Sequence, residues 1–332
     1  MRLGIVNEET WSFFDEIYAD LTENHQTTLF KRRTWKLPVF HARANRYLFY
    51  RDLQAFMRNN DVVFFEWASG LLATATYLPK TCGIVTRLHR YEMYQWVDRI
   101  NWDVVDKIFL VSQAKKREFS SMCPEQVSKI AVSSPSISLD KFKPHTKNFN
   151  GDIGIMCHMT PRKRVYDLVL TFFELTRKRD DLRLHIAGGP DPAFKDYMIA
   201  LKYIVEELDL NDKVVFYDHV SDTADWYGQI DIFISNSYSE GLQVAPMEAM
   251  ASGCYCLIHQ WNGAKELVPM DNLFYTSSEL IRKILEYCEY SDSERLKKRA
   301  EMRAWACEKF DIENTKKQIR QGIEDVFQIA SR

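Results

Sequence analysis

Short runs of apolar residues alternate along the chain with longer segments whose apolar positions recur at helical spacing. Some short runs are continuous and β-branched or aromatic, as at 62–65 and 232–234, which is typical of strands buried on both faces of a sheet. Helical spacing marks residues 164–177, 192–208 and 279–287. This alternation predicts an α/β fold with parallel sheets covered by helices. The expected strands are residues 2–6, 61–66, 82–88, 107–111, 129–132, 152–157, 183–187, 213–217, 231–235, 254–258 and 273–275.

The alternation is interrupted once, at residues 140–151, which are polar and lack periodicity. A linker here divides the 332 residues into two doubly wound halves, and a single hydrophobic core rarely grows beyond about 250 residues. We therefore expect an N-terminal domain at 1–145 and a second domain at 151–310. Residues 311–332 have an amphipathic helical pattern, and we expect this C-terminal helix to pack back toward the N-terminal domain.

The composition is that of an ordinary globular protein, with 46% hydrophobic and 27% charged residues and a net charge of -2, so charge does not indicate a nucleic-acid binder. No apolar run approaches the roughly 20 residues that cross a bilayer, and the polar N-terminus does not resemble a signal peptide. The seven cysteines are scattered, without Cys-x-x-Cys or a zinc spacing. We therefore expect no metal, no cofactor and a cytoplasmic location.

The most informative stretch runs from Ser235 to Gly253, where a strand pattern leads through a glycine-containing loop into a helix. Pro246 suits the first turn of that helix, and Gly253 suits its C-terminal end. The loop would bring main-chain amides and a helix N-terminus to the carboxyl end of a parallel strand, where α/β proteins bind phosphates. Glu240 and Glu248 flank these amides, and a carboxylate at Glu248 can accept bonds from the two hydroxyls of a ribose. Each glutamate alone is more often a solvated acid or a complement to the helix dipole, but the complete string favours a nucleotide site.

Glu240 and Glu248, with seven residues between them, resemble the Glu-x7-Glu signature of retaining glycosyltransferases of family 4. The resemblance implies a GT-B fold, in which two Rossmann-like doubly wound domains face each other across a cleft. It also implies that Glu240 lies by the donor sugar and Glu248 binds the nucleotide ribose. The family's usual aromatic residue after the glycine is replaced by a leucine here, and the next small residue by a glutamine. The resemblance assigns the donor diphosphate to the main-chain amides of Gly241, Leu242, Gln243 and Val244.

Further segments resemble the same family. Lys163 matches a lysine that neutralises the diphosphate, whereas His158 stands where the family has an arginine, and we expect Arg162 or Arg164 to supply the missing charge. Cations at a helix start oppose its dipole, which favours an anionic partner over a solvated surface. The resemblance places the segments around Gly188 and Val220 at the donor site. It places His89 at the donor sugar, although a lone histidine is more often structural. The remaining candidates are Gly188 and Val220 for donor binding and His89, with Glu240, for catalysis.

Residues 31–60 are locally basic, with eight Lys or Arg residues against one acid, Asp52, and interleaved aromatic residues. Such a segment is compatible with contact to anionic lipid, with nucleic acid, or with a helix that buries an aromatic face and exposes a basic one. We expect a peripheral contact with an anionic membrane at its inner face and do not expect a nucleic-acid partner.

These observations predict a metal-independent, hexosyltransferase-like enzyme that takes a UDP- or GDP-type nucleotide sugar. The expected acceptor is a glycan or a lipid-linked molecule, in glycan or glycolipid synthesis. A sugar-nucleotide epimerase of the same fold and a catalytically silent nucleotide-sugar-binding relative remain alternatives. A dehydrogenase is not favoured, because no Gly-x-Gly-x-x-Gly follows a strand pattern.

Overall fold

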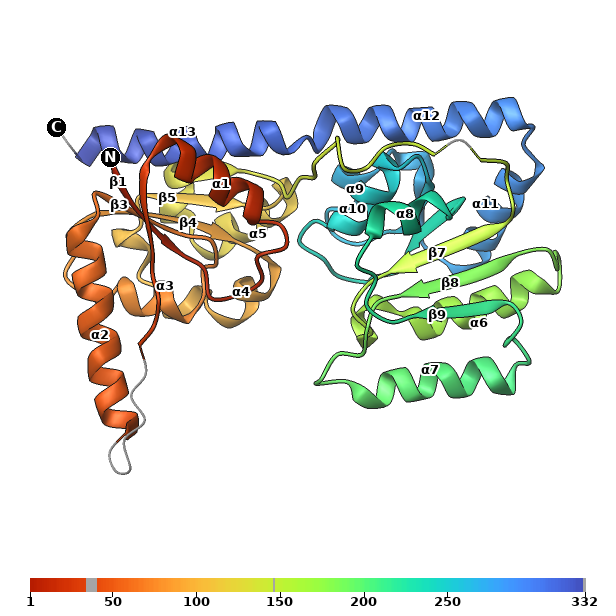
Figure 1. The fold of residues 1–332 in the computed structure, drawn as a ribbon, viewed down its shortest axis with the longest axis horizontal. Helices are drawn as coiled ribbons and strands as arrows, with labels where there is room; N and C mark the ends of the chain where they lie inside the picture. Colours follow the sequence, from red (N-terminus) through yellow and green to blue (C-terminus); the bar gives the residue numbers. More distant parts are fainter. Residues whose placement is uncertain (34–40, 146, 331–332) are drawn as a thin grey trace. The chain divides into compact units, whose positions relative to one another are not determined.

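The computed structural model describes residues 1–33, 41–145 and 147–330. The chain divides into two compact units (Figure 1). Each has its own buried hydrophobic residues. The first comprises Met1–Pro135 together with Ile312–Arg332, and the second comprises Ser136–Asp311. The boundary lies earlier than the expected domain end at residue 145, because Ile137 and Phe142 are buried in the core of the second unit.

The first unit contains a six-stranded parallel sheet in the order β2-β1-β3-β4-β5-β6. Every residue of β3 and β4 is buried, which explains their continuous apolar runs. The strands are β1 (Arg2–Val6), β2 (Gln26–Leu29), β3 (Val62–Phe65), β4 (Gly83–Leu88), β5 (Lys107–Leu110) and β6 (Ile130–Val132). The helices are α1 (Asp15–Asn24), α2 (His41–Asn59), α3 (Gly70–Ala75), α4 (Arg90–Gln95), α5 (Gln113–Met122) and α13 (Ile312–Ala330).

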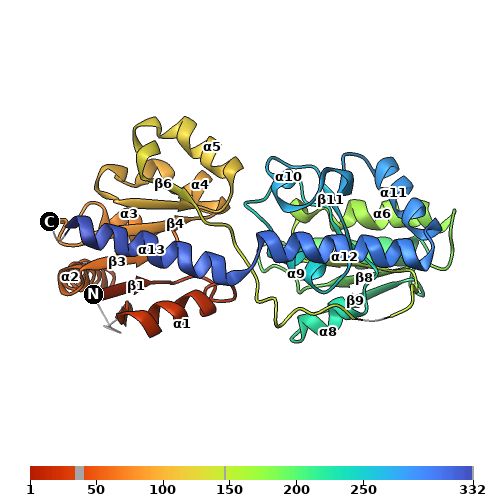
Figure 2. The same cartoon turned by 90° about the horizontal axis from the view of Figure 1, so that it is seen from above.

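Helices cover both faces of this sheet, as the view in Figure 2 shows. On one face, α1 and α13 pack a cluster that includes Phe14, Ile319 and Ile323. On the other, α2 and α3 contribute to a cluster that includes Leu53 and Leu72. The last helix of the chain is therefore part of the N-terminal core.

The second unit contains a parallel sheet in the order β12-β11-β10-β7-β8-β9. Chain order reverses between β7 and β10, which lie side by side. The loops that leave these two strands diverge, and such a switch point is where doubly wound sheets bind ligands. The strands are β7 (Asp152–Met156), β8 (Arg183–Ala187), β9 (Val214–Tyr217), β10 (Ile232–Ser235), β11 (Tyr255–His259) and β12 (Leu273–Phe274). The helices are α6 (Val165–Thr176), α7 (Lys195–Glu207), α8 (Thr223–Gly228), α9 (Val244–Ala251), α10 (Ala264–Leu267), α11 (Ser277–Glu289) and α12 (Asp292–Lys309).

The eleven strands expected from the sequence are all present, with ends shifted by a residue or so. The sequence pattern missed β2, an edge strand whose residues alternate between exposed and half-buried positions and include no large apolar run. Within the described residues, no helix combines the length and the apolar composition needed to cross a membrane.

Candidate functional site

The switch point of the second sheet brings together two loops that are far apart in the sequence. Arg162 and Lys163 belong to a short 3-10 turn, Pro161–Lys163, that follows β7. Glu240 belongs to the loop that follows β10 and precedes α9. The two loops touch through their main chain, because the amide of Tyr238 donates to the carbonyl of Arg162 at 3.3 Å.

Glu240 lies between two cations at this point. Nζ of Lys163 donates to its Oε1 at 2.8 Å, and Nη1 of Arg162 forms an ion pair with the same oxygen. Arg162 also donates to the carbonyl of Ser239 at 2.9 Å. Two positive side chains against one carboxylate leave this cluster with a net positive charge. The structure thus brings together three of the residues that the sequence proposed for the donor site.

The ionisation of Glu240 is set by its neighbours. Burial opposes the charged form, but Lys163 and Arg162 outweigh burial and lower the pKa of Glu240 to about 2. Glu240 is therefore ionised throughout the physiological range. It can accept hydrogen bonds and orient cations or hydroxyls, and it has no proton to donate near neutral pH.

Gln243 fixes this loop from within. Its amide nitrogen donates to Glu240 at 2.8 Å and to Oγ of Ser237 at 2.9 Å, while its amide oxygen accepts from Oγ of Ser235 at 2.5 Å. All four side chains are buried. Gln243, which stands where the family has a small residue, thus links the end of β10 to Glu240 through its side-chain amide. Neighbouring Leu242 is buried in the core, and Gly241 is also buried.

The N-terminus of α9 provides main-chain amides beside this cluster. Gln243 is its N-cap residue with extended backbone, and Val244 begins the helix. Among the described residues no side chain caps this end, and the first turn has no acidic residue. The first amides of a helix lack intrahelical partners and carry the positive end of the dipole. This end of α9 is therefore suited to an anion.

Pro246 is the third residue of α9, and Gly253 follows the helix with φ of 84°. Both agree with the helix start and stop read from the sequence. Glu248 lies one turn into the same helix and is half-buried, and its Oε2 accepts from the hydroxyl of Tyr227 at 2.9 Å. Burial raises the pKa of Glu248.

Three other candidates occupy separate positions around the same sheet. Gly188 follows β8 with φ of 120°, and a Cβ atom there would lie 2.0 Å from the carbonyl oxygen of Cys157. This position therefore admits only glycine without a shift of the backbone. Val220 is half-buried against the core. His158 is exposed, and its carbonyl accepts from the amide of Thr160 at 2.8 Å.

Arg164 has its own partners, so the charge beside Lys163 comes from Arg162. Nη1 of Arg164 lies 3.0 Å from Nε2 of His259, and its Nε donates to Asp167 at 3.3 Å. The sequence interpretation missed His259, Asn236 and Tyr227, which hold these loops in place. Asn236 donates to the carbonyl of Arg164 at 2.9 Å. The available signal was the position of Asn236 and His259 at the carboxyl ends of β10 and β11.

His89 lies in the first unit, directly after β4, where it is the N-cap residue of α4. Its side chain is largely buried, with Nε2 lying 3.2 Å from Oε1 of Glu66. The imidazole also stacks on the indole of Trp67, with ring centroids 4.1 Å apart. His89 thus stands at the carboxyl end of a parallel strand, as expected from the sequence.

Residues 150–289 match the family described as "Glycosyl transferases group 1". This segment is a group 1 glycosyl transferase domain. It contains the whole of the cluster around Glu240, together with Gly188, Val220 and α9. Both doubly wound units resemble those of solved proteins with the GT-B fold, which the chain shares.

Curated relatives that match part of the chain include the following three. The alpha-monoglucosyldiacylglycerol synthase of Streptococcus pneumoniae is 29% identical over 130 residues, which are 37% of this chain and 28% of that protein. The mannosylfructose-phosphate synthase of Agrobacterium fabrum is 33% identical over 111 residues, 32% of this chain and 24% of that protein. The lipopolysaccharide core biosynthesis mannosyltransferase LpsB of Rhizobium meliloti is 29% identical over 125 residues, 37% of this chain and 34% of that protein. The matches therefore span only about a quarter to a third of these relatives' own lengths.

Solved structures that match almost the entire chain include the following two. Anabaena Alr3699/HepE, solved in complex with UDP and glucose, has a TM-score of 0.79 and 18% identity, covering 98% of this chain and 99% of that one. Sucrose-phosphate synthase from Thermosynechococcus elongatus has a TM-score of 0.79 and 13% identity, covering 99% of this chain and 100% of that one. At these identities the likeness shows the fold.

Outside the group 1 domain, the basic segment at 31–60 is described in part. Trp35, Lys36 and Phe40 lie outside the described residues, as does the side chain of Arg43. The aromatic residues of the remainder separate into two sets. Phe49 and Phe56 pack against the core, whereas Tyr47 and Tyr50 are exposed by 68% and 44%. Part of the aromatic content thus serves burial, and part is exposed beside arginines.

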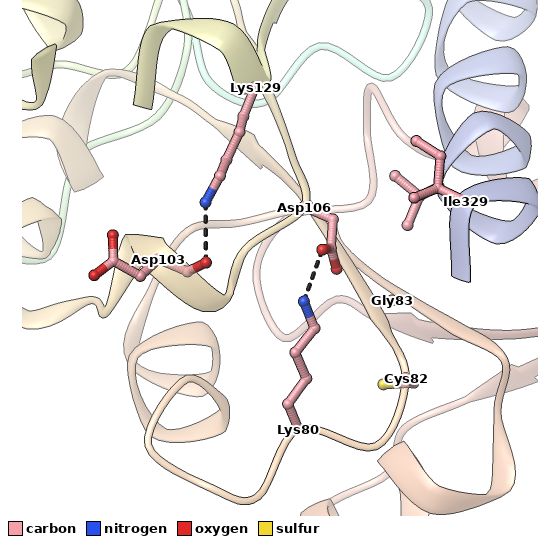
Figure 3. Close-up of a pocket in the computed structure, with 8 residues that line it drawn as sticks. Lys80, Cys82, Gly83, Asp103, Asp106, Lys129 and Ile329 are labelled. Carbon is pink, nitrogen blue, oxygen red and sulfur yellow. Dashed lines mark hydrogen bonds and ion pairs between the residues drawn. The ribbon is translucent and has the colours of Figure 1, made fainter. Parts of the chain in front are cut away.

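The first unit also contains a cavity of about 440 Å³ near the amino ends of β4 and β5 (Figure 3). Its charged side chains are satisfied locally, since Lys80 pairs with Asp106 at 2.7 Å and Lys129 donates to the carbonyl of Asp103 at 3.0 Å. The cavity lies at the amino ends of these strands, whereas His89 lies at their carboxyl ends. Parallel sheets bind ligands at the carboxyl ends of their strands. We assign the cavity no part in the candidate site.

Proposed function

We propose that the protein is a retaining glycosyltransferase that moves a sugar from a nucleotide-diphosphate donor to an acceptor hydroxyl. The observation that carries the proposal is the cationic cluster of Arg162 and Lys163 beside the uncapped end of α9, within a group 1 domain. A donor of UDP or GDP type fits this site, and the solved complex of a structural neighbour with UDP and glucose supports the UDP form. Relatives named for glycolipid and lipopolysaccharide synthesis support a glycan or lipid-linked acceptor.

The proposed chemistry follows from where charge develops. Breaking the bond between the sugar and the diphosphate puts negative charge on the departing phosphate. Lys163, Arg162 and the amides at residues 241–244 would stabilise that charge in a partly buried, positively charged site. Because these groups supply the stabilisation themselves, we propose that the reaction needs no metal ion. The leaving phosphate would help to deprotonate the acceptor hydroxyl on the same face, which gives retention.

Two glutamates take different roles in this proposal. Glu240 is ionised and held by cations, so it would orient the donor sugar and the diphosphate cations by accepting hydrogen bonds. Glu248 would bind the ribose hydroxyls through its carboxylate, with Tyr227 holding one oxygen. His89 would act in catalysis through a hydroxyl of the substrate. His158, Gly188 and Val220 would line the nucleotide.

The proposal is tested by a donor screen that measures release of nucleoside diphosphate. Wild type should consume one UDP- or GDP-sugar and attach the sugar to an acceptor with the donor's anomeric configuration. Lys163→Met should lower the rate by about 100-fold, because one stabiliser of transition-state charge is lost. Lys178→Met, an exposed lysine of the same unit, serves as the matched control and should leave the rate unchanged.

Each alternative would give a different result in the same screen. An epimerase would return an altered nucleotide sugar. It would consume no acceptor, and adding acceptor would not increase the release of nucleoside diphosphate. A silent relative would bind the nucleotide without turnover. Wild-type rates in Lys163→Met would remove the basis of the proposal altogether.

We also propose a peripheral membrane contact at the inner face of the membrane, through one face of α2. Tyr47, Tyr50, Arg51 and Arg58 are exposed and share this face by their spacing of three, four and eleven residues. Tyrosine rings suit the headgroup region, and each nearby cation adds about 1 kcal/mol of attraction to anionic lipid. The positive charge of this face therefore complements an anionic lipid surface.

Flotation with vesicles of phosphatidylglycerol and phosphatidylcholine tests the contact. The wild type should float with anionic vesicles and remain behind with purely zwitterionic ones. Tyr47→Ser/Arg58→Glu should weaken flotation by about tenfold or more. Arg177→Glu, a charge reversal at an exposed position of the second unit, should float like the wild type. Equal flotation of all three proteins would exclude this face as the lipid contact.

A further inference from the structure

A charged pair is buried at the carboxyl end of the first unit's sheet. Glu66 directly follows β3, Arg87 lies in β4, and neither has exposed surface. Nη1 of Arg87 lies 3.2 Å from Oε1 of Glu66, and Nε2 of His89 lies 3.2 Å from the same oxygen. A single carboxylate oxygen therefore meets two nitrogens from the end of the neighbouring strand.

This pair is poorly explained as a stabilising contact. Burial of an ion pair costs desolvation that its own attraction rarely recovers. Oε2 of Glu66 and Nε of Arg87 have no hydrogen-bond partner among the described residues, and a buried polar atom without a partner destabilises the fold. Two apolar side chains would fill the same space at lower cost, so the pair requires another explanation. Its contact with His89 provides one.

The imidazole of His89 is constrained on several sides. Its Nε2 meets Glu66, and its face stacks on Trp67 with an interplanar angle of 27°. The fully buried Glu92, in α4, accepts from the amide of Ala68 at 3.2 Å. This bond ties the segment after Glu66 to the helix that begins after His89. Both loops that carry the imidazole and its partner are therefore held together by buried polar contacts.

The contact with Glu66 also determines where the imidazole carries its proton. A carboxylate paired with an arginine can only accept hydrogen bonds, so Nε2 of His89 must donate. In the neutral ring, Nδ1 is then an acceptor. Such an acceptor can receive a bond from a hydroxyl group, which a sugar supplies in abundance. Glu66 thus selects the tautomer in which Nε2 donates a hydrogen bond and Nδ1 accepts one.

We propose that Glu66 is a positioning residue for the transfer reaction. It holds His89 as the Nε2–H tautomer, so that Nδ1 accepts a hydrogen bond from a hydroxyl of the substrate. Arg87 is required because it keeps the buried carboxylate paired. This inference rests on the proposed function, in which His89 acts on a hydroxyl of the substrate.

The test replaces Glu66 and Arg87 together and measures the tautomer of His89 and the kinetics of transfer separately. In Glu66→Leu/Arg87→Met both charges leave together, so no unpaired charge remains and the protein should stay folded. Nitrogen-15 NMR of histidine-labelled protein, with the His89 signal assigned by His89→Asn, should show the Nε2–H form in the wild type and a mixture in the double variant. The kcat of transfer should fall by about tenfold or more with the donor KM nearly unchanged, because orientation is lost and the diphosphate site is not.

Two single variants sharpen the result. Glu66→Gln keeps a carbonyl that accepts from Nε2, so it should preserve the tautomer and rescue most of the lost kcat. Glu125→Gln, at an exposed position of the same unit, should behave as the wild type. A wild type in the Nδ1–H form, or a double variant with wild-type tautomer and kcat, would overturn the proposal. A wild type that transfers no sugar contradicts the proposed function instead, since the tautomer signal is independent of turnover.

Discussion

At the scale of single residues, Gly188 shows how closely the loops at the switch point pack. Its φ is 120°, and a Cβ atom added there would lie 2.0 Å from the carbonyl oxygen of Cys157, so there is no room for a side chain. We expect Gly188→Ala to lower the free energy of unfolding by about 3 kcal/mol, because the backbone must shift or strain. Urea denaturation measures the change. Gly189→Ala is the matched control, since a Cβ there meets nothing within 4 Å, and equal losses in both variants would contradict this account.

Glu240 links the candidate site to the acid stability of the protein. Its folded pKa of about 2 lies below the unfolded value of about 4.3. The ionised carboxylate therefore stabilises the fold above about pH 4.5, and this contribution is lost as the pH falls toward about 2. Since Gln cannot titrate, the difference in unfolding free energy between wild type and Glu240→Gln should narrow by about 3 kcal/mol across that range. Urea unfolding at several pH values measures it, and a constant difference would contradict the assigned charge state.

The sequence predicts the position of some of these residues and not of others. The strand-loop-helix pattern pointed to Glu240, and the resemblance to the family pointed to Lys163 and Arg162. All three lie in loops after buried strands, which converge at one edge of a parallel sheet. The role of Gln243 was not predictable, since its partners Ser235, Ser237 and Glu240 become specific only once the loop has folded back on itself. The partnership of Glu66 with His89 likewise depends on the pairing of β3 with β4.

At the scale of elements, α12 begins with a complete capping box. Oγ of Ser291 accepts from the amide of Glu294, and the Glu294 carboxylate accepts from the amide of Ser291 at 2.7 Å. We expect Ser291→Ala to reduce the free energy of unfolding by about 1 kcal/mol, because amides at the helix start lose their partners. Thermal unfolding checks this, with Lys297→Ala at an exposed position of the same helix expected to have little effect. A similar loss in both variants would contradict the role assigned to the cap.

Elements buried on both faces were the most predictable from sequence. Strands such as β3, β4 and β10 are entirely buried, and their uninterrupted apolar runs mark them clearly. The edge strand β2 has a polar sequence and only partial burial, so its pairing with β1 comes from the tertiary fold and leaves no periodic signal. Helices α6, α7, α11 and α13 were found by their apolar spacing, with ends that differ by a few residues. Helix α12, in which Met302 and Ala306 are the buried residues, was not predicted.

At the scale of the whole molecule, the chain crosses from the first unit to the second and then returns. Ile319 and Ile323 of α13 are fully buried in the N-terminal core, so the last helix stabilises a sheet built from the start of the sequence. Ile323→Ala should lower the free energy of unfolding of this unit by about 3 kcal/mol. Hydrogen exchange should quicken in β3 and β4 but not in β8. Ile329→Ala, at a position 74% exposed on the same helix, should leave exchange unchanged, and faster exchange confined to the second unit would contradict this assignment.

We propose that Lys163, Arg162 and the start of α9 hold the diphosphate of a nucleotide sugar. Calorimetric titration of UDP, GDP and the corresponding nucleosides into wild type and Lys163→Met tests it most directly. We predict that one diphosphate binds much more tightly than its nucleoside, and that Lys163→Met weakens this diphosphate by about 10- to 100-fold, the value of a charged hydrogen bond, without changing nucleoside binding. Equal affinities for diphosphate and nucleoside, or unchanged diphosphate binding in Lys163→Met, would contradict the claim.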